Sequence, residues 1–181
     1  MRCIAEPAPS PTVEGDDLSE AFWVTLRGFR PSDLETIMGI VAEALHEHYD
    51  PTLYSTLSAS WPEGFLVAAD TSDRPVGFLL GVQQVASEGR VLMFAIDRSW
   101  RRRGIGQRLM TTFLDRCRER GLRRATLEVR VSNATAIRLY ARFRFSVVDL
   151  LRGYYSDGEN GYQMARDLRP TDGGIPTGRQ R

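Results

Sequence analysis

Residues Ser99 to Met110, SWRRRGIGQRLM, place three consecutive arginines beside two glycines and then continue as an apolar helical pattern. The first N–H groups of a helix have no partner within the helix, and together with the helix dipole they attract anions. Glycine lets a ligand approach the backbone, and arginine binds phosphate through paired hydrogen bonds. Three interpretations follow: a phosphate-binding loop, a nucleic-acid-binding patch, or an ordinary solvent-exposed helix start.

The common phosphate-binding motifs narrow these alternatives. All 24 basic residues of the chain are arginine, and the absence of lysine excludes the Walker A loop. Leu109 stands where a dinucleotide-binding fingerprint starting at Gly104 requires its third glycine. The remaining pattern is R-x-x-G-x-G, formed by Arg101, Gly104 and Gly106, and by itself it is a weak signal.

Hydrophobic periodicity predicts strands in runs that are joined by crossover helices. The expected strands are residues 22–29, 65–70, 76–85, 90–96, 124–131, 145–151 and 162–168. The expected helices are residues 31–45, 104–120 and 133–143. The aromatic stretch 46–64 is too apolar for a linker and too irregular for one helix, and we expect it to form a wall of the site. This order is typical of an α+β fold with a mixed, largely antiparallel sheet.

Length and composition favour one globular domain, over residues 21–168, between disordered segments at residues 1–20 and 169–181. The net charge of +1 is that of a balanced chain rather than a polycation, which argues against nucleic acid as a partner. Cys3 lies in a terminal segment and Cys117 on an apolar helical stripe, so we expect a reducing, cytoplasmic compartment. The composition also predicts no metal site and no membrane span.

Three separate blocks resemble the GNAT superfamily of acetyl-CoA-dependent N-acetyltransferases. They are the R-x-x-G-x-G loop, the stretch LEVRVSNATAIRLY and the stretch RGYYSDGENGYQMARDL, and the last two are most similar to RimI-type and archaeal protein N-terminal acetyltransferases. The resemblance extends from about Trp23 to Leu168. It implies the GNAT fold, a twisted sheet of about seven strands flanked by about four helices. It also implies acetyl transfer from acetyl-CoA to the N-terminal α-amino group of a protein, with a ribosomal protein among the candidate substrates.

The resemblance assigns a set of cofactor-binding residues. The loop implies backbone contacts to the coenzyme A pyrophosphate, and the preceding strand implies contacts to the pantetheine and thioester. The implied residues are Phe94, Ala95, Ile96, Arg101, Arg102, Arg103, Gly104, Ile105, Gly106, Gln107, Asn133 and Tyr140. Asn133 also suits a second role as the cap of the following helix, and the two roles are compatible.

The resemblance also assigns the catalytic pair. Glu128 matches the general base and Tyr140 the acid that protonates the leaving thiolate, and acetyl transfer needs both roles because an amine must lose a proton and a thiolate can take one. Direct attack suffices, so Cys117 needs no acyl-enzyme role. The structural alternatives are an ion pair of Glu128 with Arg124 or Arg130, and a core-packing role for Tyr140.

The acceptor side follows from the loop LHEHY and the hairpin RGYY. By the same resemblance, Glu47 and Tyr49 lie at the acceptor mouth, and Tyr154 and Tyr155 form the opposite wall. The alternative for these two tyrosines is an exposed hairpin pair. The oligomeric state is left open between a monomer and a weak dimer.

Two residues depart from the family pattern. Arg144 stands where relatives carry glycine or asparagine in a left-handed turn, so either the arginine is strained or the turn differs. Arg90 stands where archaeal relatives tend to carry a histidine, which leaves more of the proton transfer to Glu128 or Glu47.

Two other functions remain to be weighed. A GNAT enzyme for protein lysines or small amines would share the cofactor half and differ only in the acceptor walls. A non-enzymatic nucleic-acid binder would use the arginines of residues 101–103 and 116–124, but Asp115 and Glu119 interleave with them. That spacing is more typical of an ion-paired, solvent-exposed helix face.

Overall fold

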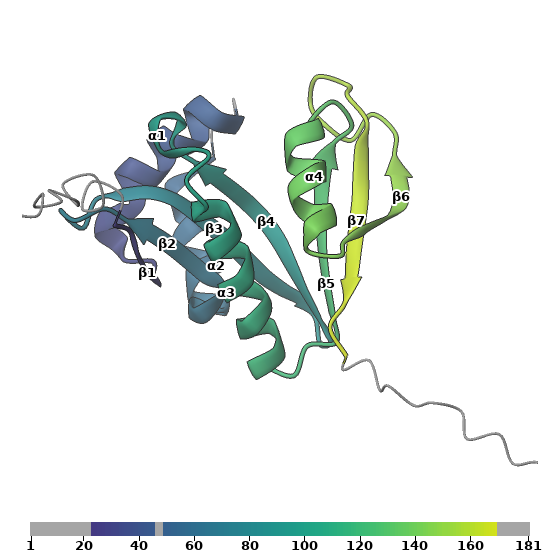
Figure 1. Cartoon of the computed structure of the whole chain (residues 1–181), viewed down its shortest axis with the longest axis horizontal. Helices are drawn as coiled ribbons and strands as arrows, with labels where there is room; N and C mark the ends of the chain where they lie inside the picture. Colours follow the sequence, from purple (N-terminus) through teal and green to yellow (C-terminus); the bar gives the residue numbers. More distant parts are fainter. Residues whose placement is uncertain (1–22, 46–48, 170–181) are drawn as a thin grey trace, which may run out of the picture.

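The computed structural model describes residues 23–45 and 49–169, which form one seven-stranded sheet with helices on both faces (Figure 1). The strands are β1 (Thr25–Gly28), β2 (Phe65–Ala69), β3 (Pro75–Val85), β4 (Glu88–Ile96), β5 (Arg124–Arg130), β6 (Ser146–Leu151) and β7 (Gly161–Asp167). The α-helices are α1 (Leu34–Leu45), α2 (Pro51–Ser60), α3 (Ile105–Glu119) and α4 (Ala134–Arg142). Three short 3-10 turns are η2 (Pro31–Asp33), η3 (Pro62–Gly64) and η4 (Arg98–Trp100).

The strand order is β1-β2-β3-β4-β5-β7-β6, and all neighbours are antiparallel except β4 and β5. The mixed, largely antiparallel α+β fold is therefore confirmed, with seven strands and four α-helices in the described part of the chain. The expected segment 1–20 and all but the first residue of the segment 169–181 lie outside the described residues.

One expectation was wrong: much of the stretch 46–64 is a regular helix, α2. Asp50 caps it by accepting a hydrogen bond from the Thr52 N–H at 2.8 Å, and Pro51 occupies its first position. Both residues are typical of a helix start and were readable in the sequence. The aromatic side chains of Tyr54 and Trp61 are fully buried, so they serve the core rather than a site wall.

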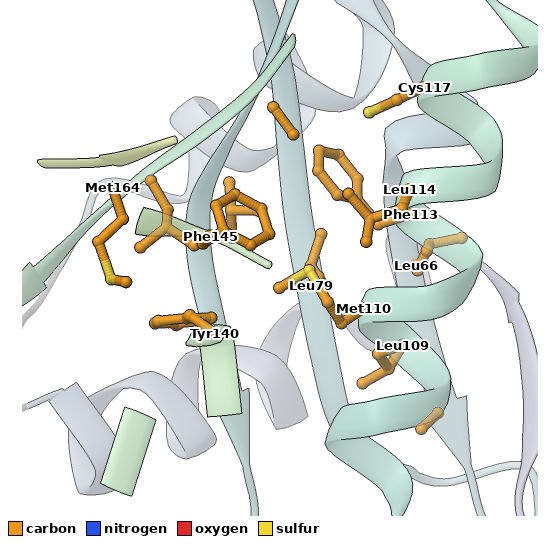
Figure 2. Packing of buried hydrophobic residues seen from close by; sticks show 14 of the residues in the cluster. Leu66, Leu79, Leu109, Met110, Phe113, Leu114, Cys117, Tyr140, Phe145 and Met164 are labelled. Carbon is orange, nitrogen blue, oxygen red and sulfur yellow. The ribbon is translucent and has the colours of Figure 1, made fainter. Parts of the chain in front are cut away.

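Alternating residues of the strands feed two separate cores. In β2, Leu66 and Ala68 belong to the core beneath α3 and α4, while Phe65 and Val67 belong to the core beneath α1 and α2. This alternation is the period of two that a strand imposes. Figure 2 shows the first core, where the apolar face of α3 meets Leu79 of β3, and Tyr140, Phe145 and Met164 lie on the opposite side. The two cores fix the helices on opposite faces of the sheet.

The two central strands separate partway along their length. β4 and β5 pair from Glu88 and Arg124 as far as Val91 and Leu127, whereas β4 continues to Ile96 and β5 to Arg130. On its other side, β4 pairs Val91 with Gly81 and Met93 with Leu80, which leaves Leu92 as an extra residue. Such a β-bulge bends its strand and increases the local twist. The bulge therefore lies where β4 turns away from β5, and the two strands diverge beyond it (Figure 1).

A left-handed arginine closes α4. Arg144 has φ 60°, its N–H donates to the Ala141 carbonyl at 2.9 Å, and the Phe145 N–H donates to the Tyr140 carbonyl at 3.1 Å. These two bonds define a Schellman cap, with Phe145 packing on the Tyr140 ring at a centroid distance of 6.1 Å. The left-handed turn is thus formed despite the arginine, and it helps to hold Tyr140 in place.

We expect Arg144→Gly to stabilise the protein by about 1 kcal/mol, because glycine adopts the left-handed region without the clash that a Cβ brings. The measurement is the free energy of unfolding in urea. Arg144→Ala is the matched control, since it removes the same charge but keeps the Cβ. Equal stabilisation by both variants would attribute the gain to charge and contradict the strain at Arg144.

Candidate active site

The loop between β4 and α3 exposes the N-terminus of a long helix. Asp97 caps η4 by accepting a hydrogen bond from the Ser99 N–H at 2.8 Å. Gly104 is the N-cap of α3 with φ 77°, provides no side-chain cap, and has no protein atom within 4 Å of the position a Cβ would take. The first turn of α3 therefore has no side-chain cap from Gly104, and the positive end of a 15-residue helix lies at this position.

The three arginines of the loop are exposed, and two of them are held by local contacts. Arg101 Nε donates to the Ile96 carbonyl at 2.9 Å, which fixes the loop to the end of β4. The Arg103 guanidinium lies 4.9 Å from the centre of the Trp100 ring. Arg102 has φ 63°. The positive charge therefore surrounds the helix start, while the loop is shaped by its own contacts.

Phe94 joins the start of α3, the free part of β4 and α4. A Cβ on Gly106 would approach Phe94 Cζ to 3.3 Å and Leu139 of α4 to 3.8 Å, so glycine lets these elements come close. The Phe94 ring also lies 6.4 Å from the Tyr140 ring. The predicted cofactor residues of β4 and of the α3 start are thus brought together beside Tyr140, at the place where β4 has left β5.

Glu128 follows immediately after the last β4–β5 pair. Its side chain is 10% exposed and is paired with Arg90 of β4, whose side chain is 22% exposed. Arg90 Nε donates to Glu128 Oε2 at 2.9 Å, Nη2 lies 2.8 Å from the same oxygen, and Nη2 donates to the Tyr154 hydroxyl at 3.0 Å. The expected alternative partners, Arg124 and Arg130, pair with other carboxylates. Glu128 therefore bridges the two diverging strands.

Tyr140 presents a buried ring to the same region. It is 7% exposed and lies between Phe94 and Phe145, so the structural alternative of core packing holds for its ring. Burial raises the pKa of Tyr140 above its ordinary value, and the neighbouring Tyr155 adds to the shift. The hydroxyl consequently stays protonated at neutral pH, which is the form that a general acid needs.

Tyr155 lies within electrostatic reach of both Glu128 and Tyr140. Burial raises the pKa of Tyr155 to about 12, although the charge of Arg130 lowers it. The Arg130 guanidinium lies 4.0 Å from the centre of the Tyr155 ring. Tyr154 packs edge-on against Tyr155 at 5.1 Å. The tyrosine pair therefore lies beside Glu128 and is held from two sides by Arg90 and Arg130.

Arg130 anchors the hairpin that carries these tyrosines. Its Nη1 lies 2.8 Å from both Asp157 Oδ2 and Glu159 Oε2, and Glu159 also accepts from the Ser132 N–H at 2.9 Å. The Ser132 bonds and the Arg130 guanidinium lower the pKa of Glu159 to about 2. The anchor is therefore ionised at every pH at which an amine is a useful nucleophile. Sequence reasoning did not identify it, because the partners are 27 and 29 residues from Arg130.

The remaining residues that the sequence assigned to the site are Asn133, Tyr49 and Glu47. Asn133 caps α4 by accepting from the Ala136 N–H at 3.0 Å, so its capping role is confirmed. Tyr49 lies between α1 and α2 and packs against the core beneath them. Glu47 lies outside the described residues. The roles of Tyr49 and of the tyrosine pair in binding an acceptor stay predictions.

Two arginines of α3 are ion-paired as their spacing predicted. Arg116 pairs with Glu119 at 2.8 Å and Arg118 with Asp115 at 2.7 Å. Within the described ranges, no group of three or more histidine, cysteine or acidic side chains could hold a metal ion. None of the described helices is long and apolar enough to cross a membrane.

An exposed helix start surrounded by arginines can bind a phosphate group, and a carboxylate and a protonated phenol can accept and donate protons. Residues 33–145 match the model of the Acetyltransferase (GNAT) family. Because this match covers more than half of the chain, the protein belongs to that family and is an acetyltransferase.

Several known proteins are similar to this chain over most of their own length. An N-alpha-acetyltransferase of Saccharolobus solfataricus is 32% identical over 80% of this chain and 93% of its own. The crystal structure of Ard1 from Thermoplasma volcanium is 39% identical, with a TM-score of 0.77 over 81% of this chain and 98% of that one. The ribosomal-protein-S18-alanine N-acetyltransferase of Escherichia coli is 26% identical, with a TM-score of 0.70 over 81% and 94%.

We expect Gly104→Ala to weaken acetyl-CoA binding by about tenfold, because a methyl group at the helix start obstructs at least one charge-assisted hydrogen bond to phosphate. Titration calorimetry measures the affinity. Gly121→Ala is the matched control, since Gly121 has φ 75° and equally open space at the opposite end of α3. Both variants lose about 1 kcal/mol of stability through backbone strain. Equal affinities for acetyl-CoA would show that the phosphate binds elsewhere.

Proposed function

We propose that this chain transfers the acetyl group of acetyl-CoA to the N-terminal α-amino group of proteins. The observation that carries the proposal is the convergence of Glu128, Tyr140 and the tyrosine pair where β4 and β5 separate. The N-alpha-acetyltransferase of Saccharolobus solfataricus and the S18-alanine enzyme of Escherichia coli support the choice of acceptor, since each is named for that class of activity. The second relative makes a ribosomal protein a reasonable substrate class.

The chain's residues suit acetyl-CoA. The N–H groups of Ile105, Gly106 and Gln107 would hold the pyrophosphate at the first turn of α3, and the arginines of residues 101–103 would add charge. Phe94, Ala95 and Ile96 would hold the pantetheine, because this part of β4 has no strand paired on its β5 side. Asn133 would add a polar contact from the start of α4. When bound, acetyl-CoA supplies a thioester whose acyl group can be transferred to an amine.

Glu128 would act as the proton acceptor. Both described contacts of Arg90 with the carboxylate are to Oε2, and Oε1 would accept the proton of the acceptor amine. At pH 7, deprotonating an α-amino group costs about 1 kcal/mol, against about 4.5 kcal/mol for a lysine side chain. A single carboxylate is therefore a sufficient base for an α-amine and a weaker one for lysine.

Tyr140 would act as the proton donor to the departing sulfur. Its raised pKa keeps the proton on the hydroxyl before the reaction, so that the proton can pass to the sulfur as the carbon–sulfur bond breaks. A covalent enzyme intermediate is not needed, and the free thiol closest to the site is unsuitable for one. Cys117 is fully buried in α3, and burial raises its pKa to about 12. The thiolate, which is the nucleophilic form, is therefore scarce.

The hairpin tyrosines would grip the acceptor backbone. Tyr154 is 44% exposed, and Tyr155 beside it is half-buried against Arg130. Glu47 and Tyr49 would form the facing wall. Aromatic walls on both sides suit an extended peptide terminus better than a freely rotating lysine side chain.

We expect Glu128→Gln and Tyr140→Phe each to lower kcat by about 100-fold, the lower end of what a general base or acid contributes. Both substitutions keep the shape of the side chain, so the KM for acetyl-CoA changes little. Steady-state kinetics with a peptide acceptor measures both constants. A Glu128→Gln enzyme with full kcat would overturn the assignment of the base and leave Glu47 or water in that role.

We expect peptides with a free N-terminus to be acetylated and the same peptides to be inert once the α-amine is blocked, even when they carry lysine. Mass spectrometry of paired peptides, each pair identical except for the block, locates the acetyl group. Transfer only to the blocked, lysine-bearing peptides would favour a lysine acetyltransferase, and transfer to neither would favour a small-molecule amine.

A further inference from the structure

We propose that Arg90 is a positioning residue that fixes the Glu128 carboxylate and ties it to the acceptor wall. The inference rests on the proposed function, because it assigns Arg90 a role that acts through the general base.

The geometry places Arg90 at a junction of three elements. Arg90 belongs to β4, Glu128 to β5, and Tyr154 to the loop between β6 and β7. One Arg90 nitrogen, Nη2, lies 2.8 Å from Glu128 Oε2 and 3.0 Å from the Tyr154 hydroxyl. A single guanidinium thus links the base to the residue that we assign to the acceptor wall, across the point where the strands part.

The form of the ion pair matters for catalysis. Arginine commonly binds a carboxylate through both of its oxygens, which would occupy the whole group. Here both described contacts to the carboxylate, from Nε and Nη2, are to Oε2. They would hold the carboxylate in one orientation through that oxygen and leave Oε1 to accept the proton.

Burial makes this arrangement stiff. Glu128 and Arg90 are 10% and 22% exposed, so water competes weakly for their hydrogen bonds. A base must be held within a fraction of an ångström of its productive position, and a fixed partner supplies that constraint. The Tyr154 hydroxyl adds a second constraint, because a shift of the acceptor wall would be transmitted to Arg90 and from there to Oε2.

A double-mutant cycle between Arg90 and Glu128 tests the role. We expect Arg90→Ala to lower kcat by about tenfold with little change in the KM for acetyl-CoA, a coupling typical of residues in direct contact. In the Glu128→Gln background, the same Arg90→Ala substitution should cost less than about twofold, because the group it positions no longer accepts a proton. Arg90→Lys restores the charge without the paired geometry and should recover only part of the loss.

Each possible result either supports or overturns the positioning role of Arg90. A loss with Arg90→Ala that persists unchanged in the Glu128→Gln background would overturn the positioning role while leaving Glu128 as the base. Full activity of Arg90→Ala would also overturn the positioning role while leaving Glu128 as the base. Full activity of Glu128→Gln alone would overturn the base, and the role of Arg90 with it. Thermal unfolding of each variant separates these effects from misfolding, and Arg90→Lys carries the test if Arg90→Ala does not fold.

Discussion

The site depends on the separation of β4 from β5. Two parallel strands in the middle of a sheet normally exchange hydrogen bonds along their whole shared length, and these two stop after Val91 and Leu127. The extra residue Leu92 bends β4 at that point. The separation leaves the β5-facing backbone of β4 unpaired beside the start of α3. It also brings Glu128, the next residue of β5, to the fork.

Packing on one face of the sheet converts this fork into a chemical site. α3 is held by its apolar face over β2, β3 and β4, which sets its N-terminus at the end of β4 (Figure 2). α4 is closed by the Schellman cap at Arg144 and presents Tyr140 toward Phe94. Charged side chains hold the hairpin between β6 and β7, because Arg90 and Arg130 fasten it to β4 and β5. The proposed phosphate-binding helix start, base, acid and acceptor wall all lie around this one interruption in the sheet.

The sequence was sufficient to predict the fold and the position of the loop between β4 and α3, because these depend on local patterns. Hydrophobic periodicity located α3, and the arginine and glycine types marked its start. Helix α2 was missed although Asp50 and Pro51 signal its beginning, because its aromatic residues resemble a binding surface as much as a core. Only packing shows that Tyr54 and Trp61 face inward.

The contacts around Glu128 could not be predicted for a different reason. Its pairing with Arg90 depends on the register of two strands that lie 38 residues apart in the chain, and on the place where they part. The nearer arginines, Arg124 and Arg130, were the natural candidates by sequence distance, yet each pairs with another carboxylate. Long-range register is a property of the folded sheet, and no local pattern encodes it.

The most direct measurement is a crystal structure of the chain with a bisubstrate conjugate, in which coenzyme A is joined through an acetyl linker to a peptide N-terminus. The account predicts the pyrophosphate on the first turn of α3 and the linker between β4 and β5, beside Glu128 and Tyr140, with the peptide against Tyr154 and Tyr155. A conjugate whose linker lies away from the fork, with Glu128 and Tyr140 untouched, would contradict it.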